Sequence, residues 1–272
     1  MSRYVFDPDV VHECALKCLG KPKPEMFDAF ADAMEAQYPG VLDRGQPWIY
    51  SLAGGAMIQM KLYYASLTEY IMIWGTPINA GGHTGRHLCG FWDTVIDGET
   101  DYYAEGQFEK TIYRPGDRIY VGPGEVRGMD FTSGVWAVEY ERGPLPTSLP
   151  FGLSDSIVSC LDWLTAAQTV SLYTDLVCQS LGHKLAAAPY GLGAPAQALT
   201  GAVARAARKL TWWLQPPKAE AAIPRDNRPW RFGTWSAEDI AAIHAPRHRA
   251  DQLDRDAARQ HPFQKQGEHA VA

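Results

Sequence analysis

Two acidic residues in aromatic, apolar stretches are the strongest candidates for chemistry. Glu139 lies between Val138 and Tyr140, and Asp93 follows Trp92, in runs typical of β-strands. If both side chains face the interior of a β-structure, burial favours their protonated forms, because an isolated carboxylate is costly to bury. Two carboxyls in one apolar pocket would share a proton and so supply a Brønsted acid beside a carboxylate that stabilises a cation. The pattern alone leaves open whether these side chains face inwards or lie on the surface.

Other familiar catalytic patterns are absent from the sequence. His83 and His87 have the spacing of zinc ligands on a helix, but the glycine-rich stretch 81–85 does not favour a helix, so we expect hydrogen-bonding turn histidines and no metal site. The sequence has no GxxxxGK[ST] phosphate loop and no GxSxG nucleophile motif. We expect Cys89 to be a small buried residue, and we expect no cofactor.

The composition indicates a globular protein. The chain has 272 residues, of which 46% are hydrophobic and 21% are charged, which excludes a largely disordered, collagen-like or coiled-coil protein. A net charge of −6 argues against nucleic-acid binding. Five cysteines without CxxC spacing favour a reducing compartment. Residues 1–18 contain three acidic side chains and no long apolar run, so we expect no secretion signal.

These residues would be positioned by a mainly β domain with flanking helices. Residues 1–47 predict an N-terminal helical segment, in which Asp7 and Pro8 begin one helix and a break over 20–24 precedes a second. Residues 48–149 predict a β-barrel or sandwich, because short aromatic and β-branched runs alternate with glycine turns. The best strand candidates are 70–74, 92–96, 110–113, 118–121 and 135–140. Residues 56–66 are compatible with a helix instead.

Residues 150–184 predict amphipathic helices with broad apolar faces. These helices could cover the mouth of the barrel, pack against a second subunit in a homo-oligomer, or lie in a membrane interface. The uncharged stretch between Asp162 and Asp175 is too short to cross a bilayer, and Trp163 and Tyr173 lie near its ends. We therefore expect association with a membrane surface without a true span. Residues 185–272 predict a linker, interrupted by glycine and proline, and an extension of unknown role.

Several sequence blocks, in a fixed order and spacing, carry a family resemblance. The blocks are 53–57, 65–70, 75–76, 82–85, 113–116, 122–125, 136–140 and 142–153. With them, residues 53–180 resemble the family that joins the fungal sterol Δ8–Δ7 isomerases and the sigma-one receptor. The resemblance implies a cupin-like β-barrel with a closed apolar pocket, capped by C-terminal helices that face a membrane. It also implies location at the endoplasmic reticulum membrane in a eukaryote.

The resemblance also implies roles for particular residues. Glu139 falls on the acidic residue that meets the cationic centre of a ligand, and Asp93 falls on its hydrogen-bonded partner. His87 agrees with the fungal enzymes, whereas Gly90 replaces an acid that both kinds of relative carry. The residues predicted to bind substrate are Tyr70, His87, Met60, Leu62, Met72, Trp74 and Trp136.

Three functions fit these expectations. The leading hypothesis is an isomerase that moves a ring double bond in a sterol or related isoprenoid, by protonation to a carbocation and loss of a neighbouring proton. The second is proton-initiated cyclisation of a linear isoprenoid. The third is a non-enzymatic receptor for cationic amphiphiles and lipids, since protonated amines resemble the carbocation.

Overall fold

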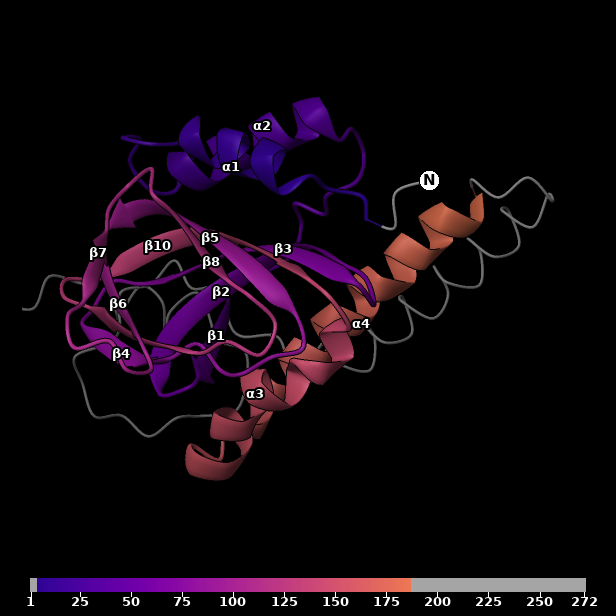
Figure 1. Cartoon of the computed structure of the whole chain (residues 1–272). Coiled ribbons are helices and arrows are strands. Elements are labelled where there is room, and N and C mark those ends of the chain that lie inside the picture. The colour runs from indigo at the N-terminus through magenta and orange to yellow at the C-terminus, as the bar shows by residue number, and fades with distance from the viewer. Residues whose placement is uncertain (1–3, 187–272) are drawn as a thin grey trace, which may run out of the picture. The chain divides into compact units, whose positions relative to one another are not determined.

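The computed structural model describes residues 4–186. They form a mainly β fold with flanking helices, as predicted (Figure 1). The helices are α1 (Pro8–Leu16), α2 (Glu25–Gln37), α3 (Leu149–Ser154) and α4 (Trp163–Ala186), with the short helical turns η1 (Leu145–Thr147) and η2 (Asp155–Ser159). The strands are β1 (Ile49–Ala53), β2 (Ala56–Ala65), β3 (Glu69–Thr76), β4 (Ala80–His83), β5 (Gly90–Gly98), β6 (Thr100–Ala104), β7 (Thr111–Tyr113), β8 (Arg118–Val121), β9 (Arg127–Phe131) and β10 (Val135–Arg142).

The strands of this region form two antiparallel sheets. One sheet has six strands in the order β1-β2-β3-β10-β5-β8, and the other has four in the order β4-β9-β6-β7. Apolar side chains from both sheets pack together, including Val95 of β5, Tyr102 of β6 and Phe131 of β9. The interior between the two sheets is therefore the place where inward-facing side chains of β3, β5 and β10 meet.

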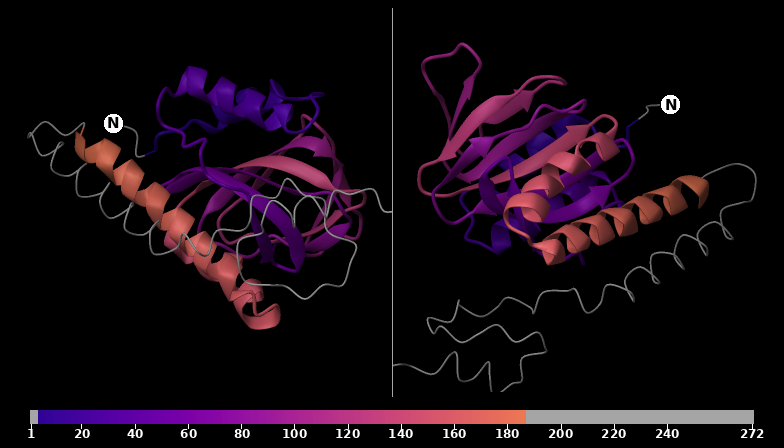
Figure 2. Two further views of the ribbon diagram at one scale, coloured as in Figure 1. Left: turned by 180° about the vertical axis from the view of Figure 1, so that it is seen from behind. Right: turned by 90° about the horizontal axis from the view of Figure 1, so that it is seen from below.

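Strand β10 lies in the middle of the larger sheet and separates two apolar layers. Val135 and Ala137 belong to the layer between the sheets, whereas Trp136, Val138 and Tyr140 belong to the layer on the opposite face. This division follows from the strand period of two, by which successive side chains point to opposite faces. Helices α1 and α2 cover the opposite face, and α3 and α4 lie on the other side of the sheet (Figure 2).

The N-terminal helices form as predicted. Helix α1 begins at Pro8, and the side chain of Asp7 caps it by accepting a hydrogen bond from the Asp9 backbone N–H at 2.8 Å. The break before α2 also lies where it was predicted. Phe30 and Met34 of α2 are fully buried and pack on the outer face of the larger sheet.

A buried polar cluster anchors the N-terminal segment to the sheet. Glu69 is 0% exposed and accepts hydrogen bonds from the Val5 backbone N–H at 2.8 Å and from the Tyr140 hydroxyl at 2.9 Å. Arg142 donates to the Phe6 carbonyl oxygen at 2.5 Å. Contacts to β3 and β10 thus hold Val5 and Phe6 against the larger sheet.

The five predicted strands all form, but the helical alternative for residues 56–66 is wrong. Ala56–Ala65 is β2, which pairs with β1 on one side and with β3 on the other. Its residues Ile58, Met60 and Leu62 face the interior at the strand period of two. A short apolar run is ambiguous locally, and here the two neighbouring strands decide its conformation.

Helix α4 closes part of the interior between the sheets. Leu176 and Val177 pack into the inner apolar layer, and the Tyr173 hydroxyl donates to the Ser66 carbonyl oxygen at 2.9 Å. Among residues 4–186, no helix is both long enough and apolar enough to traverse a bilayer. The predicted linker and extension, apart from the end of α4, lie outside the described residues.

The segment that joins α3 to α4 exposes large apolar side chains. Val158 is 76% exposed, Leu161 67% and Trp163 61%, so apolar surface is concentrated at one end of the helical pair. Folding has not covered this surface within the described chain, although the rest of both apolar layers is well buried.

Candidate active site

Glu139 and Asp93 face each other across two paired strands. They are direct partners in the antiparallel pairing of β10 with β5, and both line a cavity between the sheets. Directly opposed residues of an antiparallel pair have Cβ atoms about 4.5–5.5 Å apart. Asp93 is only 1% exposed. The predicted carboxyl pair therefore forms.

The cavity is large and mostly apolar. Its volume is about 160 Å³, measured over the positions open to the centre of a water-sized sphere. One water needs roughly 10–15 Å³ on the same measure, so the cavity has room for a ligand much larger than water. Leu145, Phe151, Thr169 and Tyr173 border the cavity from the C-terminal helices, and the sheets provide most of the remaining wall.

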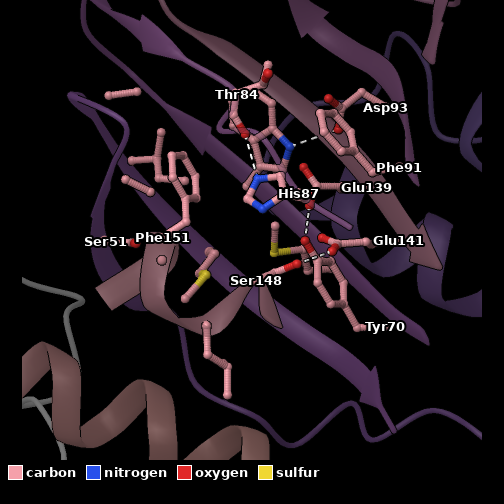
Figure 3. Close-up of a pocket in the computed structure, with 18 of the residues that line it drawn as sticks. Ser51, Tyr70, Thr84, His87, Phe91, Asp93, Glu139, Glu141, Ser148 and Phe151 are labelled. Atoms are coloured by element: carbon pink, nitrogen blue, oxygen red, sulfur yellow. Dashed lines mark hydrogen bonds between the residues drawn. The ribbon is translucent and has the colours of Figure 1, made fainter. Parts of the chain in front are cut away.

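Hydrogen bonds hold each carboxyl in place (Figure 3). The Tyr70 hydroxyl of β3 donates to Oε1 of Glu139. The indole Nε1–H of Trp74, four residues further along the same strand, donates to Oδ1 of Asp93 at 3.0 Å. Since i and i+4 lie on the same face of a strand, β3 presents both donors to the pair on β5 and β10.

The surroundings keep a proton on the pair. Burial, followed by the negative charges of Asp93 and Glu141, raises the pKa of Glu139 well above its usual value. Burial also raises the pKa of Asp93, but the hydrogen bond from Trp74 opposes that rise. An indole N–H can only donate, so it stabilises the ionised form of Asp93. Glu139 likewise accepts a hydrogen bond from Tyr70, and burial raises the pKa of both carboxyls, so the pair as a whole retains a proton beside the cavity.

The structure brings together all but one of the residues predicted for the site. The cavity-lining residues that the sequence predicted are Met60, Leu62, Tyr70, Met72, Trp74, His87, Asp93 and Glu139. Trp136, which the sequence also predicted to bind substrate, does not line the cavity. It is three residues from Glu139 on the same strand and so points to the opposite face, where it packs against Phe27 and Trp48.

The two histidines are occupied by local contacts. His83 Nδ1 accepts a hydrogen bond from the Gly85 backbone N–H at 3.0 Å, and His87 Nε2 is hydrogen-bonded to the Thr84 carbonyl oxygen at 2.7 Å. The His87 ring also packs edge-on against Phe151, with 4.8 Å between ring centroids. Over residues 4–186, no three His, Cys, Asp or Glu side chains are grouped so that they could hold a metal ion.

Sequence reasoning missed a third carboxylate in the cavity. Glu141 is 3% exposed and lines the same cavity, and Ser148 donates to its Oε1 at 2.6 Å. The signal was present, because Glu141 follows Glu139 by two positions and a strand places both on one face. Tyr102 of β6, which lines the same cavity, was also missed; burial, followed by the negative charge of Asp93, raises its pKa.

The chain is similar in sequence to known proteins. Residues 1–184 match the family described as "ERG2 and Sigma1 receptor like protein". The chain belongs to this family. The sigma non-opioid intracellular receptor 1 of Danio rerio is 36% identical over 174 residues, covering 63% of this chain and 78% of that protein. The C-8 sterol isomerase erg2 of Aspergillus fumigatus is 35% identical over 166 residues, covering 60% of this chain and 70% of that protein.

Membership of the ERG2 and Sigma1 receptor family confirms the resemblance but leaves two kinds of activity. One relative is named as a receptor and the other as an isomerase, at nearly equal identity. Among solved structures, an RmlC-like cupin from Shewanella frigidimarina covers 37% of this chain at 16% identity and a TM-score of 0.32. A choice between receptor and enzyme must rest on the chemistry of the site.

Proposed function

We propose that this protein is an isomerase that moves a ring double bond of a sterol or related isoprenoid, from the 8,9 to the 7,8 position or an equivalent pair. The observation that carries the proposal is the pair of buried carboxyls, Glu139 and Asp93, which face each other inside an apolar cavity. We assign the proton to Glu139 and the negative charge to Asp93. A C-8 sterol isomerase among the relatives supports the substrate class.

The reaction needs an acid, a base and stabilisation of a cation. Glu139 delivers its proton to one alkene carbon, which leaves a tertiary carbocation on the other. The Asp93 carboxylate stabilises this cation and accepts the proton lost from the neighbouring carbon, so the double bond forms one position along. The substrate and the two carboxyls account for every proton and electron in this shift.

Aromatic side chains around the cavity favour the same intermediate. Trp74, Phe91 and Tyr102 line it together with the carboxyl pair. The face of an aromatic ring attracts a cation by roughly 0.5–2 kcal/mol, with the larger values in sites that exclude water. An apolar wall also keeps water from capturing the carbocation before the proton is lost.

The decisive experiment is incubation of the purified protein with a zymosterol-type sterol, with products identified by mass spectrometry. Appearance of the 7,8-unsaturated isomer supports the proposal. Parallel incubations contain farnesyl- and geranylgeranyl-type substrates. If only these are converted, to cyclic hydrocarbons or alcohols, the protein is a proton-initiated cyclase and the isomerase proposal is wrong.

A receptor for cationic amphiphiles is the second candidate. The cavity holds Glu139, Asp93 and Glu141, and an acidic apolar cavity suits a protonated amine with a hydrophobic body. The sigma receptor relatives support this reading. Tight binding of such amines without turnover of any alkene would favour the receptor over the enzyme.

We further propose that the protein docks on a membrane surface without spanning it. The exposed side chains of Val158, Leu161 and Trp163 lie together in the segment before and at the start of α4. Apolar side chains with an interfacial tryptophan suit insertion to the depth of the lipid headgroups. Such docking would let a lipid substrate pass from the bilayer to the cavity, which α3 and α4 border.

A further inference from the structure

Glu141 is a buried carboxylate that the proposed reaction does not use. It lies two positions after Glu139 on β10, shares the inner face and borders the same cavity. Its negative charge is among the causes of the raised pKa values of Glu139, Asp93 and Tyr70. A third acidic group in an apolar cavity is costly to keep unless its hydrogen bonds compensate for the lost hydration.

Glu141 belongs to a series of neighbouring polar groups that starts at the carboxyl pair, and Figure 3 shows two hydrogen bonds of this series, Tyr70 to Glu139 and Ser148 to Glu141. The Tyr70 hydroxyl donates to Glu139, and Tyr70 is also the direct partner of Glu141 in the antiparallel pairing of β3 with β10. The Ser148 hydroxyl donates to Oε1 of Glu141 at 2.6 Å. The order of groups is therefore Asp93, Glu139, Tyr70, Glu141 and Ser148, and each member can exchange a proton with the next.

The series runs from the dry interior to the protein surface. Asp93 is 1% exposed and Glu141 3%, whereas Tyr70, Glu139 and Ser148 are each half-buried and border the cavity. Ser148 follows the exposed Thr147, so it lies at the end of the series nearest the surface. Beside Ser148, burial raises the pKa of the Cys89 thiol to about 11, so this thiol stays protonated and does not take a proton from the series.

We propose that Tyr70, Glu141 and Ser148 form a proton-exchange route between the Glu139–Asp93 pair and solvent. The inference rests on the proposed proton-transfer function, which ends each turnover with the proton on Asp93 and none on Glu139. The pair can reset by moving that proton directly across, or Glu139 can receive a solvent proton while Asp93 releases its own. The route supplies the second possibility.

Each transfer along the route balances. Ser148 accepts a proton from water and gives its own hydroxyl proton to the Glu141 carboxylate. Glu141 then passes a proton to the Tyr70 oxygen as the Tyr70 hydroxyl proton moves to Glu139. One proton enters Glu139 from solvent, Tyr70 and Ser148 end unchanged, and no oxidant or reductant takes part. The proton left on Asp93 leaves by the same series in reverse, after passing through Glu139.

The first test needs no substrate. When the ligand-free protein is moved into deuterium oxide, the infrared C=O stretch of the buried protonated carboxyl shifts as its proton exchanges. We expect Glu141→Gln and Ser148→Ala to slow this shift by at least about tenfold, equivalent to an added barrier of about 1.4 kcal/mol. Glu141→Asp and Ser148→Thr, which keep the exchangeable group, should exchange faster than Glu141→Gln and Ser148→Ala.

A surface control separates the route from a general change of charge. Glu109 is exposed on the loop before β7, and Glu109→Gln makes the same chemical change there. This variant should exchange like the unmodified protein. Equal exchange rates in the unmodified protein, Glu141→Gln and Ser148→Ala would overturn the proposed route.

The second test uses turnover in deuterium oxide. With the route open, the new C–H position of the isomerised sterol should contain solvent deuterium. In Glu141→Gln the product should instead retain more substrate hydrogen, and steady-state turnover should slow more than the first turnover does. If the sterol is isomerised but Glu141→Gln changes neither isotope content nor exchange, the route is wrong and the isomerase stands. If no substrate reacts but exchange slows in the variants, the route stands and the proposed function fails.

Discussion

Replacement of Glu139 by glutamine tests the central chemistry most directly. Glutamine keeps the size of the side chain and can still hydrogen-bond to Tyr70, but it carries no transferable proton. A correctly placed general acid contributes about 10²–10⁴ in rate, so turnover of the sterol should fall by that factor. Its raised pKa allows Glu139 to carry the transferable proton, which glutamine cannot supply.

The same variant should bind amines less tightly. In the unmodified protein, a protonated amine can draw the negative charge of the pair onto Glu139, whereas Glu139→Gln would leave the charge only on the more deeply buried Asp93. Loss of one partner from a buried, hydrogen-bonded charge pair costs about 2–5 kcal/mol of binding free energy. Product formation is followed by mass spectrometry and amine affinity by calorimetry.

The control is Glu109→Gln, which removes a carboxylate from an exposed loop. It should leave turnover and amine affinity unchanged. Circular dichroism establishes that both variants are folded. If folded Glu139→Gln forms product at a near-normal rate and binds amines as before, Glu139 is only a structural carboxyl and the proposed mechanism is refuted.

Four further outcomes are expected from the geometry. Asp93→Asn should reduce turnover less than Glu139→Gln, and should move the alkaline limb of the pH–rate profile to lower pH because the charge of Asp93 raises the Glu139 pKa. Trp136→Ala should lower the free energy of unfolding in urea by about 3–5 kcal/mol without changing ligand affinity, because Trp136 packs beneath α2. The raised pKa values mean that the folded pair binds more protons than the same carboxyls do in the unfolded chain, where they titrate near pH 4. The free energy of unfolding should therefore fall as the pH rises above about 4. This fall should be less steep in the double variant Asp93→Asn, Glu139→Gln. Replacement of Val158 and Trp163 by Asp should reduce flotation with lipid vesicles.

Each of these has a result that contradicts it. An unshifted pH–rate profile in Asp93→Asn would mean that the charge of Asp93 does not raise the pKa of Glu139. If Trp136→Ala is as stable as the unmodified protein but binds ligand more weakly, Trp136 contributes to ligand binding and not to stability. An unchanged slope of stability against pH in the double variant would mean that the pair titrates normally, and undiminished flotation would move the membrane contact elsewhere.

The sequence predicted the carboxyl pair because strand placement and family resemblance agreed on it. Glu139 and Asp93 each lie in a run typical of a strand, and the cross-strand register then sets one opposite the other. Glu141 needed only the period of two to be placed on the same face. Its omission came from considering each acid singly rather than following the inner face of the strand along its length.

Other features depend on packing that no local pattern contains. Trp136 and Glu139 are both surrounded by apolar residues in the sequence, and only the presence of α2 on one face and a cavity on the other distinguishes their roles. Strand β2 likewise takes its conformation from pairing with β1 and β3. Sequence periodicity shows which side chains share a face of a strand. Which helix, sheet or cavity lies against that face depends on the tertiary packing.

The anchor of the N-terminal segment has a consequence for the order of synthesis. The carbonyl of Phe6 is held by Arg142, which is 136 residues later in the chain. At about 5–20 residues per second, a ribosome needs roughly 7–27 s to add those residues. The first residues to emerge are therefore among the last to reach their final contacts.

During that interval the buried faces of α1 and α2 have no sheet to cover them. Phe30 and Met34, both 0% exposed in the finished fold, remain available to solvent and to chaperones until β10 has left the ribosome. A nascent chain arrested before Arg142 should therefore be cleaved readily within α1 and α2 by added protease. Extension far enough for Arg142 to leave the ribosome should protect both helices in a single step, so the timing of translation sets when the face behind the carboxyl strand is closed.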